Sequence, residues 1–210
     1  MSSDLPDAES QRIADTKSQG ITDGKSQRIE VEQKFPLKDD SAVNDLLEAV
    51  RRLGGTWQEP CEQVDAYFAH PSRDFSKTDE ALRIRRQGDA VWVTYKGPKL
   101  DATTKTRHEV DLPLANPDDA DSMAEILRAL GFRHVSDVRK LRRVARISWN
   151  DRAVEIACDE VPPLGHFAEL EIVATQDSLT EARETVTSLA SELGLSGSQR
   201  RSYLELLLDA

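Results

Sequence analysis

The chain has 210 residues, of which 38% are hydrophobic and 31% are charged, and its formal net charge is −10. This length suffices for one domain with a sizeable core. The acidic balance argues against non-specific nucleic-acid binding, which requires a basic surface. No apolar run approaches the ~20 residues of a membrane span, and no secretory signal follows the first Met. Two cysteines outside any metal-type cluster favour a reducing, cytoplasmic setting.

The first 26 residues are polar and carry an eight-residue repeat. SQRIADTK at 10–17 is followed by SQGITDGK at 18–25, and SQRIE at 26–30 begins a third copy. Each copy has one Ile and no apolar face. This composition predicts a disordered tail at 1–26, followed by one folded domain at 27–210.

The rest of the chain is strongly patterned. Alternating apolar and polar residues predict strands at 27–37, 62–70, 81–87, 90–97, 104–114, 138–150, 151–161 and 165–174. Amphipathic periodicity predicts helices at 41–55, 117–132, 178–195 and 199–208. Asp40 or Ser41 is expected to cap the first helix, and Gly54 or Gly55 to end it. Turn signals at Gly88-Asp89 and Asn150-Asp151 predict hairpins and a largely antiparallel sheet.

Charged residues gather on one face of nearly every predicted strand. Side chains two apart in a strand share a face, so Glu30, Glu32 and Lys34 project together, opposite Ile29 and Val31. The same division recurs at Arg83 with Arg85, Arg107 with Glu109 and Asp111, Lys140 with Arg142, Glu155 with Asp159, and Glu169 with Glu171.

Two interpretations of these faces are open. A single sheet with a solvated outer face is the simpler one. However, the charged faces are poor in Ser, Thr and Gln, and the acids lie on the first and last strands while the bases lie on the middle ones. A curled sheet would therefore oppose carboxylates and cations across a cavity, with helices outside. Carboxylates bind hard divalent cations, and Arg and Lys bind phosphate, so a metal–polyphosphate is the ligand that needs both.

The motif formed by Glu30, Glu32 and Lys34 resembles the E-x-E-x-K signature of the CYTH domain, also called the triphosphate tunnel metalloenzymes. Further resemblances follow in order at LRIR (82–85), TYKGP (94–98), RHE (107–109), KLR (140–142), LGHFAELE (164–171) and RRSYLELL (200–207). The last two resemble the class IV adenylyl cyclase branch, and the likeness covers residues 28–208. It implies an α+β fold, an eight-stranded antiparallel β-barrel enclosing a tunnel, with helices packed outside.

The resemblance also implies roles for individual residues. The carboxylates that would hold Mg²⁺ or Mn²⁺ are Glu30, Glu32, Glu109, Asp159, Glu169 and Glu171. The triphosphate would be bound by Lys34, Arg83, Arg85, Lys96, Arg107, Lys140, Arg142 and Arg201, with Arg201 closing over the tunnel mouth. Lys34, Glu32 and Glu171 are the candidate catalytic residues. Tyr67 and Cys158 are expected in the core, and Arg143 on the outside.

The expected function is that of a class IV adenylyl cyclase, which converts ATP to cyclic AMP and pyrophosphate. One alternative is a triphosphatase that hydrolyses inorganic tripolyphosphate, thiamine triphosphate or a nucleoside triphosphate, because both activities share the motif residues. A second alternative is a module that binds polyphosphate or nucleotide without turnover. The expected partner is a small-molecule triphosphate, and the resemblance to the cyclase branch favours a homodimer.

Overall fold

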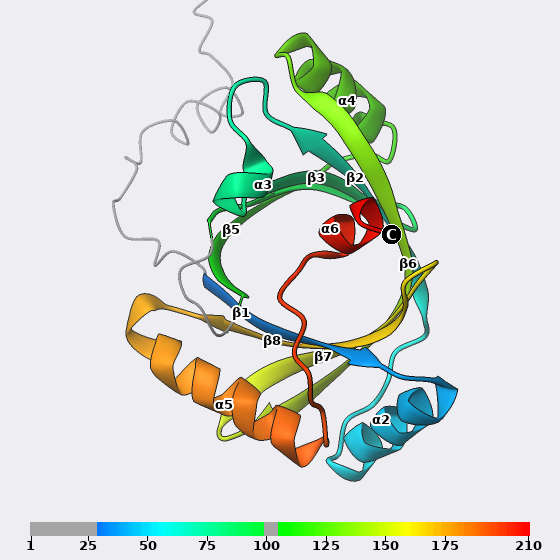
Figure 1. Cartoon of the computed structure of the whole chain (residues 1–210), viewed down its shortest axis with the longest axis vertical. Helices are drawn as coiled ribbons and strands as arrows, with labels where there is room; N and C mark the ends of the chain where they lie inside the picture. Colours follow the sequence, from blue (N-terminus) through cyan, green and yellow to red (C-terminus); the bar gives the residue numbers. More distant parts are fainter. Residues whose placement is uncertain (1–28, 99–104) are drawn as a thin grey trace, which may run out of the picture.

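A computed structural model describes residues 29–98 and 105–210 (Figure 1). The predicted disordered tail at 1–26 and the first two residues of the predicted domain lie outside the described residues. The described part of the chain forms eight strands that close into a barrel in the order β1-β5-β4-β3-β2-β6-β7-β8. Every neighbouring pair is antiparallel. The predicted eight-stranded antiparallel barrel with outer helices is therefore confirmed.

The elements have the following bounds. The strands are β1 (Ile29–Leu37), β2 (Cys61–Ala69), β3 (Ala81–Gln87), β4 (Ala90–Lys96), β5 (Lys105–Leu114), β6 (Arg133–Trp149), β7 (Arg152–Val161) and β8 (Gly165–Ala174). The helices are α2 (Asp40–Arg52), α3 (Phe75–Thr78), α4 (Asp119–Ala129), α5 (Leu179–Glu192) and α6 (Tyr203–Leu208), with a 3₁₀ turn η1 (Gln176–Ser178).

The barrel closes where the first strand meets the last. β1 pairs with β8 along its whole length, placing Glu32 opposite Glu171 and Lys34 opposite Glu169. On its other edge β1 pairs with β5, where Glu30 lies opposite Arg107. Segments distant in the sequence thus bring their charged residues to neighbouring positions on the inner surface.

The two predicted hairpin turns are present between β3 and β4 and between β6 and β7. Asn150 and Asp151 have φ angles of 49° and 59°, the left-handed conformation that a two-residue hairpin turn requires. Gly88 has a φ of 55° in the other turn. Both turns keep consecutive strands adjacent and fix their register.

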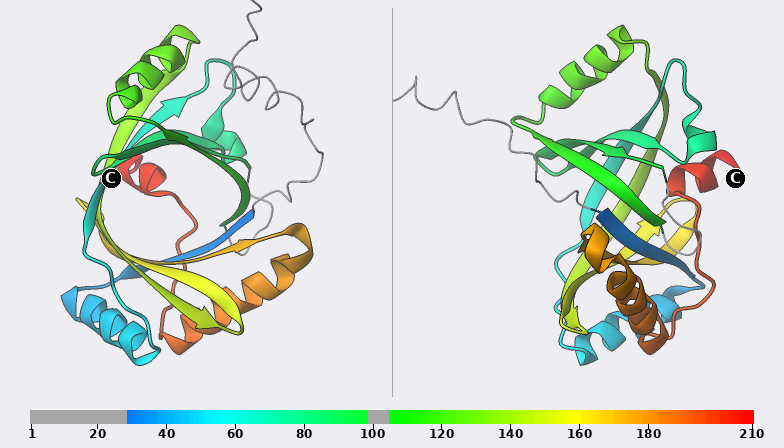
Figure 2. Two further views of the ribbon diagram at one scale, coloured as in Figure 1. Left: turned by 180° about the vertical axis from the view of Figure 1, so that it is seen from behind. Right: turned by 90° about the vertical axis from the view of Figure 1, so that its left-hand side faces the viewer.

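The apolar core lies between the barrel and its helices. Helices α2 and α5 cover the outer faces of β1, β7 and β8, where Ile29, Val31, Ile156 and Leu170 are buried. Helix α4 covers β3 and β4 on another side, as the views in Figure 2 show. Full burial of an Ile or Leu side chain stabilises the fold by about 1.5–3 kcal/mol. Apolar residues therefore face outward to the helices, and the interior is left to the charged ones.

Several predicted boundaries differ from the observed ones. Helix α2 is capped by Asp39, whose Oδ1 accepts a hydrogen bond from Ala42 N at 3.1 Å, rather than by Asp40 or Ser41. Strand β6 begins at Arg133, five residues before the predicted start, because it pairs with β2 back to Ala69. The four-residue helix α3 was not predicted, since it is too short to show periodicity.

One end of the barrel is filled by α6, which lies across the opening in Figure 1. Tyr203 packs among the inward-facing Tyr67, Val138, Val161 and Phe167. The other end carries exposed side chains. Among the described helices, none has the length and apolar character needed to cross a membrane.

Candidate active site

The barrel interior contains a polar cavity of about 350 Å³. Twelve of the predicted site residues line it: Glu30, Glu32, Lys34, Arg83, Arg85, Lys96, Arg107, Glu109, Lys140, Arg142, Glu169 and Glu171. The predicted Asp159 and Arg201 do not line it. The curled-sheet interpretation of the charged faces is therefore the one that matches the structure.

The first wall of the cavity is acidic and is formed by β1 and β8. Because Glu32 lies opposite Glu171, like charges meet across neighbouring strands, an arrangement that destabilises a sheet. The charge of Glu30, together with burial, raises the pKa of Glu171 well above its ordinary value. Burial also raises the pKa of Glu30. The acidic wall thus carries unfavourable charge that a bound cation would relieve.

Lys96 on β4 links two of the carboxylates. Its Nζ donates to Glu30 Oε2 at 2.5 Å and lies 2.9 Å from Glu109 Oε2. Burial would lower the pKa of Lys96, but Glu30 and Glu109 outweigh it and raise that pKa above its usual range. Burial would likewise raise the pKa of Glu109, but Lys96 holds it below the ordinary value. Lys96 therefore stabilises the ionised forms of both acids.

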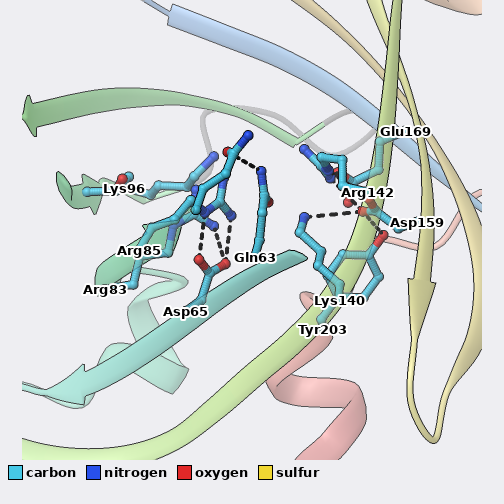
Figure 3. A network of polar contacts seen from close by, with 12 residues as sticks. Gln63, Asp65, Arg83, Arg85, Lys96, Lys140, Arg142, Asp159, Glu169 and Tyr203 are labelled. Carbon is cyan, nitrogen blue, oxygen red and sulfur yellow. Dashed lines mark hydrogen bonds and ion pairs between the residues drawn. The ribbon is translucent and has the colours of Figure 1, made fainter. Parts of the chain in front are cut away.

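The opposite wall is basic, and Asp65 on β2 holds part of it in place. Asp65 Oδ1 accepts from Arg85 Nε at 2.6 Å, and Oδ2 accepts from Arg85 Nη2 at 2.6 Å and Arg83 Nη1 at 3.3 Å (Figure 3). Burial would raise the pKa of Asp65, but Arg83 and Arg85 outweigh it and hold that pKa well below its usual range. The sequence analysis did not single out Asp65, although its position two residues before Tyr67 puts it on the inner face.

Asp159 on β7 holds the other part of the basic wall, Lys140 and Arg142, in place. Its carboxylate accepts from Arg142 Nε at 2.6 Å, Arg142 Nη2 at 2.5 Å, Lys140 Nζ at 3.2 Å and Tyr203 Oη at 2.8 Å. Its side chain is fully buried beneath these groups. The structure thus differs from the predicted role of Asp159 as a metal ligand, since cationic side chains already enclose its oxygens. Arg142 also donates to Glu169.

Arg201 is the other predicted residue that the structure keeps away from the cavity. Its guanidinium pairs with Asp209 at 3.1 Å, and 45% of its side chain is exposed. The next residue, Ser202, caps α6 by accepting from Glu205 N at 3.1 Å, and this cap sets the direction in which the chain enters the helix. The expected closure of the mouth by Arg201 is therefore not what the structure shows.

Lys34 lies at the end of the cavity that α6 fills. Its side chain is almost completely buried, and its Nζ donates to the backbone oxygen of Arg201 at 2.5 Å. The Nζ also lies 4.0 Å from the ring centroid of Tyr203, a cation–π contact. Lys34 is thus held in one orientation at the closed end of the cavity.

The opposite end of the cavity is open to solvent. Three of the residues that line it there are exposed: Gln58, Asp111 and Arg146. Gln63, Gln87 and Trp92 line the same end and were not singled out by the sequence analysis. The cavity is therefore accessible from this end, and Lys34 lies at the other.

The carboxylates fit a hard divalent cation by their chemistry. Oxygen donors from Glu30, Glu32 and Glu171 face a polar cavity, which suits Mg²⁺ or Mn²⁺. Within residues 29–98 and 105–210, however, no three His, Cys, Asp or Glu side chains converge closely enough to hold a metal ion by themselves. Because Mg²⁺ is often bound by one or two carboxylates together with substrate phosphates, this spacing agrees with a metal that enters with its ligand.

The chain was also compared with known proteins. The sequence profile of the CYTH domain matches residues 28–203. A candidate adenylate cyclase of Methanocaldococcus jannaschii is 36% identical over 181 residues, which cover 85% of this chain and 98% of that protein. The adenylate cyclase CyaB of Aeromonas hydrophila is 31% identical over 185 residues, covering 85% and 88%. A solved structure of a Pyrococcus horikoshii protein is 40% identical, with a TM-score of 0.72 and coverage of 86% and 98%.

Proposed function

Since the chain belongs to the CYTH family, whose members are adenylate cyclase-like or triphosphatase enzymes, we propose that it converts ATP to cyclic AMP and pyrophosphate with a divalent metal. The observation that carries this proposal is the cavity itself, where the acidic wall of β1 and β8 faces arginines and lysines of β3, β4 and β6. A metal–triphosphate carries both positive and negative charge and needs both walls.

Glu30, Glu32 and Glu171 would hold Mg²⁺ or Mn²⁺, with Glu109 and Glu169 beside them. The metal would neutralise charge on the phosphates and polarise the phosphoryl oxygens. Burial raises the pKa of Glu30 although Lys96 acts against it, and the charge of Glu30 together with burial raises the pKa of Glu171, so a further cation at these carboxylates would stabilise their ionised forms. A metal requirement follows directly from this crowding.

The basic wall would bind the triphosphate. Arg83, Arg85 and Arg142 present guanidinium groups that suit bidentate contact with phosphate oxygens, while Lys140 supplies a point charge. Asp65 and Asp159 hold these groups from behind, so they are oriented before the substrate arrives. Such preorganised charge stabilises a transition state without reorganisation during the reaction.

In the proposed reaction the oxygen of the ribose 3′-hydroxyl attacks the α-phosphorus, a new phosphorus–oxygen bond forms, and the hydroxyl proton passes to water at the open end of the cavity. The bond between the α-phosphorus and the bridging oxygen breaks, and pyrophosphate leaves. Lys34 would stabilise negative charge on the departing pyrophosphate, because it lies at the closed end beyond the phosphates. Glu32 and Glu171 would act by holding the metal, which would supply positive charge to the phosphates.

A triphosphatase is the second candidate, and one observation favours it. The exposed Gln58, Asp111 and Arg146 leave the end of the cavity open to water, which is the nucleophile of a hydrolase. Two relatives more than 30% identical are named as adenylate cyclases, one of them as a candidate, and for this reason the cyclase is placed first.

A product assay tests the proposal. Purified full-length chain is incubated with ATP, tripolyphosphate or thiamine triphosphate, each with Mg²⁺, Mn²⁺ or EDTA, and the products are separated by chromatography. Metal-dependent cyclic AMP and pyrophosphate are the expected result. Formation of orthophosphate without cyclic AMP would show that the protein is a triphosphatase rather than a cyclase. Absence of product with every substrate would indicate a module that binds its ligand without turnover.

A homodimer also belongs to the proposal. It rests on the resemblance to the cyclase branch, and sedimentation of the full-length chain over a range of concentrations tests it. A sedimentation coefficient that stays at the monomer value at all concentrations would contradict the dimer.

A further inference from the structure

A pair of glutamines on the cavity wall has a hydrogen-bonding capacity that the protein does not use. Gln63 Nε2 donates to Gln87 Oε1 at 2.7 Å, across the pairing of β2 with β3. Gln63 is only 4% exposed, yet its Oε1 has no hydrogen-bond partner within the described residues. A buried acceptor left without a donor destabilises a fold, so an amide kept in this state points to a donor that comes from outside the chain.

The chemistry of this pair is the same whichever way the amides are oriented. With Gln63 as donor, the atoms left over are an acceptor on Gln63 and a donor on Gln87. If both amides are reversed, the donor is left on Gln63 and the acceptor on Gln87. In either case the pair presents one donor beside one acceptor.

An aromatic ring lies close to this pair. Trp92 on β4 lines the same cavity, and it is the direct cross-strand partner of Arg85. Arg85 and Gln87 are two apart on β3, so Trp92, Arg85 and Gln87 lie on one inner surface. The indole is only half-buried, and its exposed part belongs to the cavity rather than to the outer core.

Neither feature is explained by phosphate or metal binding. Phosphate oxygens are matched by Arg and Lys, and Mg²⁺ by carboxylates, whereas an indole face provides no hydrogen-bond donor to an anion. Figure 3 shows Gln63 between the Asp65 network and the Asp159 network, directly beside the cations of the basic wall. The amides and the ring therefore suit a neutral, planar group attached to the phosphates.

We propose that Gln63, Gln87 and Trp92 form a subsite for the nucleobase of the substrate. The base stacks on Trp92, and the amide pair contacts a base edge that carries a donor beside an acceptor, as the N6 amine and N7 of adenine do. This inference rests on the proposed function, because it takes a triphosphate in the cavity as given. It places the base toward the open end and the phosphates toward Lys34.

Calorimetry tests the subsite. The full-length protein is titrated with ATP or with inorganic tripolyphosphate, in both cases in buffer that contains Mg²⁺. Trp92→Leu removes the ring, and we expect ATP affinity to fall roughly ten-fold, in line with the loss of one stacked base. Gln63→Leu removes both amide atoms, and we expect a fall of about three-fold or more. Tripolyphosphate affinity should stay within about two-fold for both variants, since it has no base to lose.

Matched controls carry the same substitutions on the outer face of the barrel. Gln33→Leu changes an amide that contacts Thr187, and Trp149→Leu changes an indole that contacts Ser188. Both controls should bind ATP and tripolyphosphate as the unchanged chain does. Tryptophan emission gives a second readout, because ATP should quench it in the unchanged chain and in Trp149→Leu, but much less in Trp92→Leu.

The inference is overturned if Trp92→Leu and Gln63→Leu weaken ATP and tripolyphosphate by the same factor, or if they change neither. Failure of the proposed function is a separate result. If the protein binds ATP more tightly than tripolyphosphate but forms no product, the base subsite is supported and the proposed cyclase activity is ruled out. If the protein forms product only from tripolyphosphate and binds ATP no more tightly than tripolyphosphate, the base subsite is ruled out, but the protein is still an enzyme that acts on a triphosphate.

Discussion

Asp65 and Arg85 form a two-point ion pair inside the barrel, with both contacts at 2.6 Å and both side chains more than nine-tenths buried. Asp65 lies on β2, across the barrel from β1, which carries Glu30 and Glu32. The ion pair makes Asp65 a positioning residue, whose effect on a ligand passes through Arg83 and Arg85.

Asp65→Asn should weaken both the fold and triphosphate binding. Removing one partner of a buried ion pair leaves an uncompensated charge, and the free energy of unfolding should fall by about 3–5 kcal/mol. The KM for ATP should rise, because Arg83 and Arg85 lose their common anchor. Chemical denaturation and steady-state kinetics measure the two effects.

Asp121→Asn is the matched control for this prediction. Asp121 accepts from Arg86 at 2.6 Å, as Asp65 does from Arg85, but on the surface with 84% of its side chain exposed. The loss of an exposed pair should cost at most about 1 kcal/mol and leave kinetics unchanged. If the two substitutions lowered the free energy of unfolding and changed KM by the same amounts, burial of the Asp65 ion pair would not be the cause of its effect.

Glu32→Gln should abolish turnover and leave the metal-free protein as stable as before or more stable. Glu32 faces Glu171 across neighbouring strands, so the substitution removes one member of a repulsive pair along with one metal ligand. Thermal melts in EDTA and the product assay with Mg²⁺ test both parts. A large decrease in the melting temperature of the metal-free variant would be incompatible with an acidic wall around Glu32.

Glu171→Gln should raise the melting temperature of the metal-free protein near pH 7.5 by a few degrees. The charge of Glu30 and burial raise the pKa of Glu171 above its ordinary value of 4.5, so the folded state binds this proton more tightly than the unfolded state. Such a group lowers stability at pH values above the unfolded pKa, where the unfolded chain is ionised. The gain should shrink as the pH falls toward 4.5 and disappear below it, where Glu171 is protonated in both states.

Melts of the two proteins in EDTA across this pH range provide the measurement. Glu184→Gln on the exposed face of α5 is the control, and it should show no such pH dependence. A gain that is constant with pH would trace the effect to packing rather than to charge.

Lys140 should make triphosphate binding depend on pH. Burial and the neighbouring Arg142 lower the pKa of Lys140 to about 8. Above that pH the ligand-free protein loses this positive charge, so affinity for tripolyphosphate should fall as the pH rises from 7 to 9. The free energy of unfolding of the ligand-free protein changes in the opposite direction. It rises between pH 8 and 10.5, because in this range Lys140 keeps its proton in the unfolded chain but loses it in the folded one.

Lys140→Met separates these effects. The variant should bind tripolyphosphate more weakly at pH 7 and should lack the decline between pH 7 and 9. Calorimetry at several pH values measures both. A decline of the same size in the variant would assign the titration to another group.

The faces of the strands were predictable because side-chain alternation does not depend on the partner strand. Glu30, Glu32 and Lys34 share a face in any sheet that contains residues 29–37. The closure of that sheet depends on pairing between β1 and β8, which are separated by most of the chain. Alternation holds no information on that contact, so the barrel was expected from the family resemblance alone.

The partners of the acids could not be predicted from the sequence. Asp65 and Asp159 hold arginines, while Glu32 lies opposite Glu171 on the acidic wall, although all four alternate in the same way. Which charge meets which is set by the register of neighbouring strands. The expected closure of the mouth by Arg201 came from the family resemblance, whereas in the structure Arg201 pairs with Asp209 just before the cap at Ser202.

The closure of β1 on β8 has a consequence for synthesis of the chain. β1 is made first among the barrel strands and must wait for β8, made last, before its long edge is paired. Until then β1 and β7 carry open edges, and their outer faces include Ile29, Val31, Val154 and Ile156; such apolar edges pair with other chains. A polypeptide that stops before Gly165 would keep those edges permanently, so premature termination should yield aggregates rather than a smaller, partly active barrel.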